Sequence, residues 1–200
     1  IKGDGLLLVD SGGQYKWGTT DITRTIGIGA PTQEMKENYT RVLKGHIALA
    51  SAKFKQGTCG KDIDALARKP LQDAGLDYAH GTGHGVGCYL CVHEDAAHIS
   101  PRGLRELQDG MLLSNEPGYY KEGEYGIRLE NLIFVQKNDE CLYFETVTFA
   151  PFSGQMILME QLSDPELEWL NHYHQKVTEI LSAYLDQNEK EWLRKYISMA

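Results

Sequence analysis

Five side chains of metal-binding types lie in glycine-rich segments that favour β-strands. They are four carboxylates and one imidazole, namely Asp10, Asp21, His84, Glu116 and Glu130. Carboxylate oxygens and an imidazole suit two adjacent divalent cations, because carboxylates can bridge the pair and leave a water between the metals as a nucleophile. The set therefore predicts a metallohydrolase.

The two aspartates are more informative together than apart. Asp10 follows an apolar run and precedes Ser11-Gly12-Gly13, so on its own it is typical of a turn. Asp21 lies on the far side of a predicted hairpin turn, where cross-strand pairing can bring its carboxylate beside that of Asp10. Two carboxylates that close repel each other unless a cation neutralises them. The pair therefore favours a metal site over a simple turn.

The segment 80–87 reads HGTGHGVG, and its four glycines are difficult to explain by packing alone. Glycine weakens a strand unless the backbone must approach something closely. A single histidine in a strand is usually a hydrogen-bonded structural residue, but this context, with His80 and His93 nearby, makes His84 a ligand candidate. The other histidines lack such surroundings and are predicted to lie on the surface: His98, His172 and His174.

Two glutamates complete the candidate set. Glu116 precedes Pro117-Gly118 after an apolar run, and Glu130 ends the strand-like segment 126–130. A carboxylate in an apolar strand is costly to bury unless it is paired or binds a metal. Arg128 has the same strand parity as Glu130, so it could orient a liganding carboxylate from outside the metal's coordination shell. The alternative is a surface ion pair between Arg128 and Glu130.

The pattern of apolar residues predicts an α+β domain that positions these side chains. A hairpin and a third strand are expected within 6–29, and helices are expected from a Thr32 cap to about residue 54 and over 61–74. Short strands are predicted at 111–115, 125–136 and 143–149. An amphipathic helix begins near Ser163, and a short helix follows around Trp192. The predicted division is a catalytic domain over 1–160 and a helical extension over 161–200.

Composition limits the classes of binding partner that the protein can have. The 200 residues carry a net charge of -8 without a long Lys/Arg cluster, which argues against nucleic acid or an anionic membrane as the main partner. No apolar run is long enough to span a bilayer. Four cysteines give neither the density nor the spacing of a secreted disulfide framework, which predicts a reducing, cytoplasmic location. Small molecules or peptides are the favoured ligands.

Several motifs together resemble those of the M24 metallopeptidases, and within them the Xaa-Pro aminopeptidases, or aminopeptidase P, of the three-domain cytosolic type. The motifs are VDSGG at 9–13, DITRT at 21–25, GTGHGVG at 81–87, VHE at 92–94, NEPGYY at 115–120 and GIRLE at 126–130. The similarity covers residues 6–151, with a weaker signal in the tail. It implies a pita-bread fold, a curved antiparallel sheet covered by helices.

The resemblance also implies roles for individual residues. Asp10 would chelate one of two metal ions, most often Mn²⁺; Asp21 and Glu130 would bridge both; and His84 and Glu116 would complete the second. His93 would contact substrate near the scissile bond, and His80 would be a second active-site histidine. Glu116 would also carry a proton to the leaving nitrogen, and Arg128 would lie just outside the metal ligands.

The implied activity is release of an N-terminal residue that precedes proline, by a homodimeric enzyme. The family has a further active-site histidine upstream of the first aspartate ligand, whereas this chain begins nine residues before Asp10. We therefore expect the first part of the catalytic fold to be missing here, and the chain alone to be a poor catalyst. Two alternatives remain open, a prolidase acting on Xaa-Pro dipeptides and a creatinase-fold binding module without metals.

Overall fold

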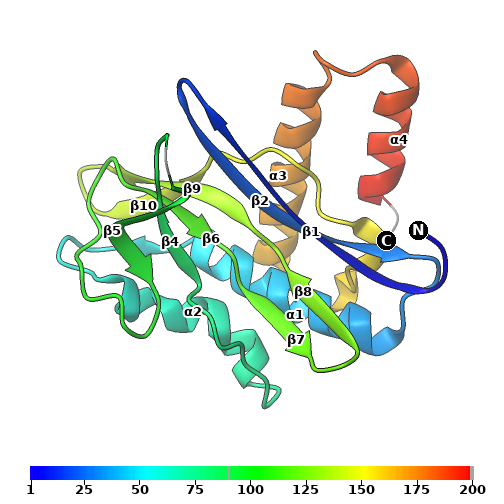
Figure 1. Ribbon diagram of the computed structural model, residues 1–200, viewed down its shortest axis with the longest axis horizontal. Coiled ribbons are helices and arrows are strands. Elements are labelled where there is room, and N and C mark those ends of the chain that lie inside the picture. Colours follow the sequence, from blue (N-terminus) through cyan, green and yellow to red (C-terminus); the bar gives the residue numbers. More distant parts are fainter. Residues whose placement is uncertain (90, 199–200) are drawn as a thin grey trace.

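The computed structural model describes residues 1–89 and 91–198, except for the side chains of residues 95 and 96. Figure 1 shows antiparallel strands with helices packed beside them. The helices are α1 (Gln33–Ala50), α2 (Gly60–Gln72), α3 (Asp164–Leu181) and α4 (Gln187–Ser198). The strands are β1 (Gly5–Tyr15), β2 (Gly18–Ile28), β3 (Lys53–Phe54), β4 (Gly83–Val86), β5 (His93–Ile99), β6 (Leu112–Asn115), β7 (Gly118–Lys121), β8 (Tyr125–Arg128), β9 (Asn131–Lys137) and β10 (Leu142–Thr146). The α+β prediction is confirmed.

Strands β1 and β2 form one long hairpin whose tip projects from the body of the molecule (Figure 1). The prediction of a third strand within 6–29 is wrong. Pairing continues from Tyr15↔Gly18 without interruption, and the Gly13 N–H donates to Thr20 Oγ1 at 3.0 Å. The turn therefore lies at residues 16–17, and the glycine and threonines that follow it extend the strand.

A six-stranded sheet in the order β3-β10-β9-β6-β4-β5 forms the centre of the molecule. Helices α1 and α2 pack together below it in Figure 1, and the adjoining core includes Leu49, Ile63, Leu113 and Ile133. Strand β4 lies between β5 and β6, where a Cβ on Gly83 would overlap the carbonyl of Ser114. The glycine-rich sequence thus permits the close backbone approach that places β4 beside β6.

The segment predicted as one strand over 125–136 is divided in two. Strand β8 pairs with β7, whereas β9 joins the large sheet. At the division, the Leu129 N–H donates to Pro117 O at 3.2 Å and the Glu130 N–H donates to Thr23 O at 3.0 Å. Residues 129–130 therefore pass from one set of strands to another, and Glu130 is brought against β2.

Helix α3 packs against α1, and α4 packs against α3. Helix α3 begins after Ser163, whose N–H donates to Glu166 Oε2 at 2.7 Å, and its residues Leu170, Tyr173 and Val177 enter the core. The division between residues 160 and 161 stays a prediction, and residues 199–200 of the predicted extension lie outside the described residues. Among the described helices, none is long and apolar enough to span a membrane.

His174 corrects the prediction of a surface histidine. Its side chain is buried in α3, and Nε2 accepts a hydrogen bond from the Phe152 N–H at 3.1 Å. Burial, together with the charge of Arg24, lowers the pKa of His174 to about 4. His46 of α1 is buried too, and the same two causes lower its pKa to about 3. Both imidazoles are therefore neutral at neutral pH.

These histidines predict a loss of stability in acid. The unfolded chain takes up protons near pH 6.5, whereas folded His174 resists protonation down to about pH 4. Its contribution is complete above pH 6.5 and is lost as the pH falls toward 4. We expect His174→Gln to reduce the drop in the free energy of unfolding between pH 7 and pH 5 by about 1 to 2 kcal/mol. Urea unfolding at both pH values measures it.

The control is His172→Gln, at an exposed position of the same helix. It removes a histidine without touching the buried contact to Phe152. An equal change in the two variants would contradict the assignment of the acid sensitivity to His174.

Candidate metal centre

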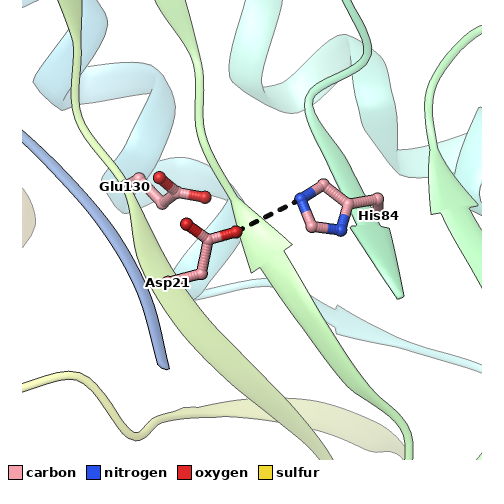
Figure 2. Close-up of side chains that lie close together, drawn as sticks. All are labelled: Asp21, His84 and Glu130. Carbon is pink, nitrogen blue, oxygen red and sulfur yellow. Dashed lines mark ion pairs between the residues drawn. The ribbon is translucent and has the colours of Figure 1, made fainter. Parts of the chain in front are cut away.

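Three of the predicted ligands converge from different parts of the chain. Asp21 lies on β2, His84 on β4 and Glu130 between β8 and β9, and one ligand atom from each lies within 4.8 Å of the others. Figure 2 shows the three side chains directed toward a common point. Glu130 is 2% exposed and His84 8%, so the cluster is a buried one.

The orientation of His84 leaves its ligand nitrogen available. Nδ1 lies 2.9 Å from the carbonyl oxygen of Gly85, which can only accept, so Nδ1 carries the proton of the neutral ring. Nε2 then faces the carboxylates, 3.6 Å from Asp21 Oδ2 and 3.4 Å from Glu116 Oε1. A backbone bond of this kind fixes the tautomer of a metal-binding histidine.

Glu116 is held next to His84 by Ser114. The Ser114 hydroxyl donates to Glu116 Oε1 at 3.1 Å and accepts from the His84 N–H at 2.9 Å. One serine therefore fixes two candidate ligands relative to each other. Glu116 thus borders the compact cluster of Asp21, His84 and Glu130.

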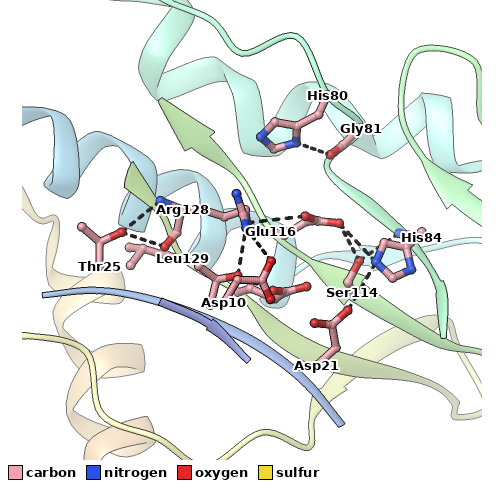
Figure 3. Close-up of polar contacts among 12 residues, drawn as sticks. Asp10, Asp21, Thr25, His80, Gly81, His84, Ser114, Glu116, Arg128 and Leu129 are labelled. Atoms are coloured by element: carbon pink, nitrogen blue, oxygen red, sulfur yellow. Dashed lines mark hydrogen bonds and ion pairs between the residues drawn. The ribbon is translucent and has the colours of Figure 1, made fainter. Parts of the chain in front are cut away.

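Arg128 connects the remaining carboxylates, as Figure 3 shows. Its Nη2 donates to Asp10 Oδ2 at 2.6 Å, and its Nε lies 3.9 Å from Glu116 Oε2. The Nε–H also donates to Thr23 Oγ1 at 3.1 Å, and that hydroxyl donates to Glu130 Oε2 at 2.6 Å. The alternative of a surface ion pair between Arg128 and Glu130 is not what forms, because Glu130 is buried and Arg128 pairs with Asp10.

His80 and His93 line the space in front of the cluster. A cavity of about 820 Å³ borders both rings together with His84 and Glu116. The His93 ring centroid lies 4.3 Å from that of His84 in an edge-to-face arrangement. His80 Nδ1 lies 2.8 Å from Gly81 O, and its Nε2 accepts from the Tyr120 hydroxyl at 2.9 Å. Both candidates therefore face the cavity beside the predicted ligands.

The electrostatics of the cluster favour a cation. Burial, followed by the charges of Glu116, Asp21 and Asp10, raises the pKa of Glu130 to about 8. Burial likewise raises the pKa of Glu116 above its ordinary value, although His84 opposes the shift. Such crowding of carboxylates is relieved by bound positive charge. The oxygen and imidazole donors fit a divalent metal ion, and each individual ligand assignment stays a prediction.

The supporting hydroxyls were not anticipated. Thr23 and Ser114 bind candidate carboxylates, and the Tyr120 hydroxyl accepts from Arg128 Nη1 at 3.0 Å. Strand parity contains part of the signal, because Thr23 shares a face with Asp21 and Ser114 shares a face with Glu116. The hydrogen bond from Tyr120 to His80 joins residues 40 positions apart, and no sequence periodicity indicates it.

Comparison with known proteins bears on what such a centre does. The profile of metallopeptidase family M24 matches residues 1–137, and that of the C-terminal region of peptidase M24 matches residues 140–199. The chain belongs to family M24. The expected family membership is therefore confirmed.

Individual M24 relatives agree. Aminopeptidase P1 of Arabidopsis thaliana is 48% identical over 203 residues, which cover 96% of this chain and 32% of that protein. The crystal structure of an X-prolyl aminopeptidase from Caenorhabditis elegans, described as a cytosolic enzyme with a di-nuclear active site, superposes with a TM-score of 0.91 at 39% identity. It is matched over 96% of this chain and 33% of its own. The pita-bread fold expected for M24 is confirmed.

A prolidase from Pyrococcus horikoshii OT3 is also similar, at 34% identity and a TM-score of 0.65. That similarity covers 74% of this chain and 41% of the prolidase. The chain spans about a third of the length of the aminopeptidases it matches. M24 membership therefore applies to these 200 residues, and it does not by itself establish the activity of a full-length aminopeptidase.

Proposed function

We propose that this chain forms the metal-binding part of an Xaa-Pro aminopeptidase, which releases the N-terminal residue of a peptide when proline follows it. The observation that supports this most is the convergence of Asp21, His84 and Glu130 in a chain of which 96% superposes on one third of the X-prolyl aminopeptidase, 33% of its length. The similarity to prolidase is lower and covers less of the chain. An aminopeptidase is therefore preferred to a prolidase.

Two divalent metal ions, most readily Mn²⁺, would be held by the five predicted ligands. Their ligands would be the carboxylates of Asp10, Asp21, Glu116 and Glu130 and the imidazole of His84. When bound, the ions supply Lewis acidity, which lowers the pKa of water and polarises a carbonyl group. All five candidate ligands are present in the sequence, which argues against a metal-free binding module.

The protein's own side chains would then direct the proton and the substrate. Glu116, held by Ser114, would accept a proton from the attacking water and deliver it to the leaving prolyl nitrogen. His93, at the cavity beside His84, would donate a hydrogen bond to the oxyanion that develops on the scissile carbonyl. Arg128 would fix the carboxylates of Asp10 and Glu116 relative to each other. His80, hydrogen-bonded to Tyr120, would line the part of the cavity that receives the substrate.

The proposed substrates are peptides with proline at the second position. The prolyl nitrogen belongs to a tertiary amide without an N–H, so a site that recognises it selects by ring shape rather than by hydrogen bonding. A cytoplasmic location and a homodimeric assembly belong to the same proposal, as does the absence of nucleic acid or membrane among its partners.

The test compares matched peptides. We expect the full-length polypeptide that carries this chain, loaded with Mn²⁺, to cleave Xaa-Pro-Yaa at least about 100-fold faster than Xaa-Ala-Yaa, and EDTA to abolish the cleavage. The rate of cleavage is measured by quantifying the released N-terminal residue by chromatography. Cleavage confined to Xaa-Pro dipeptides would favour a prolidase instead. Bound metal without hydrolysis of any Pro-containing peptide would contradict both activities.

A further inference from the structure

Arg24 is a buried arginine whose partners are all neutral. It is 9% exposed, and its guanidinium donates to six oxygens. They are Glu130 O at 2.6 Å, Asn131 Oδ1 and Ala150 O at 2.7 Å, Thr23 O at 2.9 Å, and Pro151 O and the Tyr173 hydroxyl at 3.1 Å. All five of its N–H groups thus have acceptors. A buried charge is costly unless it is fully hydrogen-bonded, so moving any of these acceptors away from Arg24 would cost free energy. The guanidinium therefore holds the acceptors in fixed positions.

The position of Arg24 on β2 separates it from the proposed ligands. Successive side chains of a strand point to opposite faces, so Asp21, Thr23 and Thr25 share one face and Arg24 occupies the other. Thr23 and Thr25 contact Glu130 and Arg128 on the metal side. Arg24 points instead into the C-terminal region, so β2 connects the candidate metal site with that region.

Glu130 is held by β2 at three places. Its N–H donates to Thr23 O at 3.0 Å, and its carboxylate accepts from Thr23 Oγ1 at 2.6 Å. Its carbonyl accepts from Arg24 Nη1 at 2.6 Å, the shortest of the six arginine contacts. Since β8 ends at Arg128 and β9 begins at Asn131, these bonds replace the strand pairing that residue 130 lacks. Arg24 therefore fixes the backbone from which the Glu130 carboxylate extends.

The other side of Arg24 is provided by the C-terminal region. Tyr173 of α3 places its hydroxyl 3.1 Å from Arg24 Nη2, where it also accepts from the Ala150 N–H at 3.3 Å. The guanidinium stacks 4.3 Å from the centre of the Phe152 ring. Helix α3 thus reaches Glu130 through a single intervening side chain.

We propose that Arg24 is a positioning residue through which the C-terminal region, by way of Tyr173, sets the metal affinity of the site at Glu130. The inference rests on the proposed metal-binding function and adds a determinant outside the ligand set. Lysine cannot replace Arg24, because it lacks the planar fork that reaches the carbonyls of Glu130 and Ala150 together. Metal affinity is therefore expected to depend on the shape of this side chain as well as its charge.

The experiment measures metal affinity directly. Arg24→Lys and Tyr173→Phe are made in the full-length polypeptide and titrated with Mn²⁺ by calorimetry and with Co²⁺ by visible absorption. We expect Arg24→Lys to weaken binding by about 10- to 100-fold, the range typical of residues that support metal ligands. Tyr173→Phe, which removes one hydrogen-bonding group, is expected to weaken it by about 2- to 10-fold. The Co²⁺ spectrum of Arg24→Lys should change in intensity as Glu130 shifts.

Tyr39→Phe is the matched control. Tyr39 is buried like Tyr173, and its hydroxyl accepts from the Ser153 N–H at 3.1 Å in the same segment, but it is not one of the six hydrogen-bond acceptors of Arg24. We expect Tyr39→Phe to lower the urea midpoint while leaving metal affinity within about twofold. This comparison separates a general loss of stability from a specific effect on the site.

The outcomes distinguish this inference from the proposed function. If the parent polypeptide binds neither Mn²⁺ nor Co²⁺, the proposed function fails and the inference falls with it. If the parent binds metal and natively folded Arg24→Lys and Tyr173→Phe bind it equally well, the inference alone is overturned. Equal weakening in Tyr173→Phe and Tyr39→Phe would overturn it too, because the effect would then follow stability rather than the contact with Arg24.

Discussion

Replacing Glu130 with glutamine is expected to abolish metal-dependent hydrolysis and, without metal, to stabilise the fold. The first effect follows from the loss of a predicted bridging carboxylate, and we expect hydrolysis to fall on the order of 10³-fold. The second follows from burial and carboxylate crowding, which raise the pKa of Glu130 to about 8. An amide of nearly the same shape carries no charge and can still accept from Thr23 Oγ1.

The stability effect has a defined dependence on pH. The carboxyl of Glu130 ionises near pH 4.5 in the unfolded chain and near pH 8 in the fold, so its contribution is complete below 4.5 and is lost as the pH rises toward 8. In EDTA at pH 7, Glu130→Gln should raise the free energy of unfolding by about 1 to 3 kcal/mol. At pH 4.5 the difference should nearly vanish.

Urea unfolding at the two pH values, with and without Mn²⁺, measures these effects. The control is Glu122→Gln at an exposed position in the β7–β8 turn, which should change neither hydrolysis nor stability. Destabilisation of the metal-free Glu130→Gln variant at pH 7 would refute the account, because it would mean that the native fold favours the ionised form. Mn²⁺ should stabilise the parent and not the variant, since only a ligand bound to the native state adds stability.

The convergence of three predicted ligands could be anticipated because the relevant signals are local. Asp21, His84 and Glu130 stand out from their apolar, glycine-rich surroundings, and the structure brings them together. The Thr32 cap was predicted from residue type, and its hydroxyl accepts from the Met35 N–H at 3.3 Å. Local rules succeed where a few neighbouring residues decide the conformation.

The errors arise where distant residues decide. The alternation of side chains through 125–136 is that of a single strand, and only bonds from Leu129 and Glu130 to remote carbonyls divide it. Residues 18–20 have the composition of a turn, yet their pairing with β1 keeps them extended. Secondary structure was thus overridden by tertiary contacts that a short window of sequence does not contain.

The misassigned His174 is different, because the sequence did contain the signal. Residues 170, 173, 174 and 177 follow helical spacing, and all four are buried on the face of α3 toward the core. Because histidine is a polar residue type, it was assigned to the surface, although the helical spacing places residue 174 on the buried face. Arg24 is a second polar residue inside the protein, and strand alternation places it on the face of β2 opposite Asp21 and Thr23.

Replacing His93 with glutamine is expected to separate catalysis from metal binding. His93 faces the cavity beside His84, but it is not among the three residues whose ligand atoms converge. If its role is to stabilise the developing oxyanion, His93→Gln should lower kcat by about 10²- to 10³-fold with KM and metal content nearly unchanged. Glutamine keeps a donor but cannot reproduce the position of the imidazole N–H.

The comparison with His84→Gln makes the prediction specific. That variant should lose both metal and hydrolysis, because His84 Nε2 faces the carboxylates of Asp21 and Glu116. Steady-state kinetics on an Xaa-Pro-Yaa peptide, combined with metal analysis of the same samples, distinguish the two. Loss of metal from His93→Gln would make His93 a ligand, and an unchanged kcat would remove it from the reaction. The short distance of 4.3 Å between the two rings makes the contrast informative, since neighbouring imidazoles would then serve different steps of one reaction.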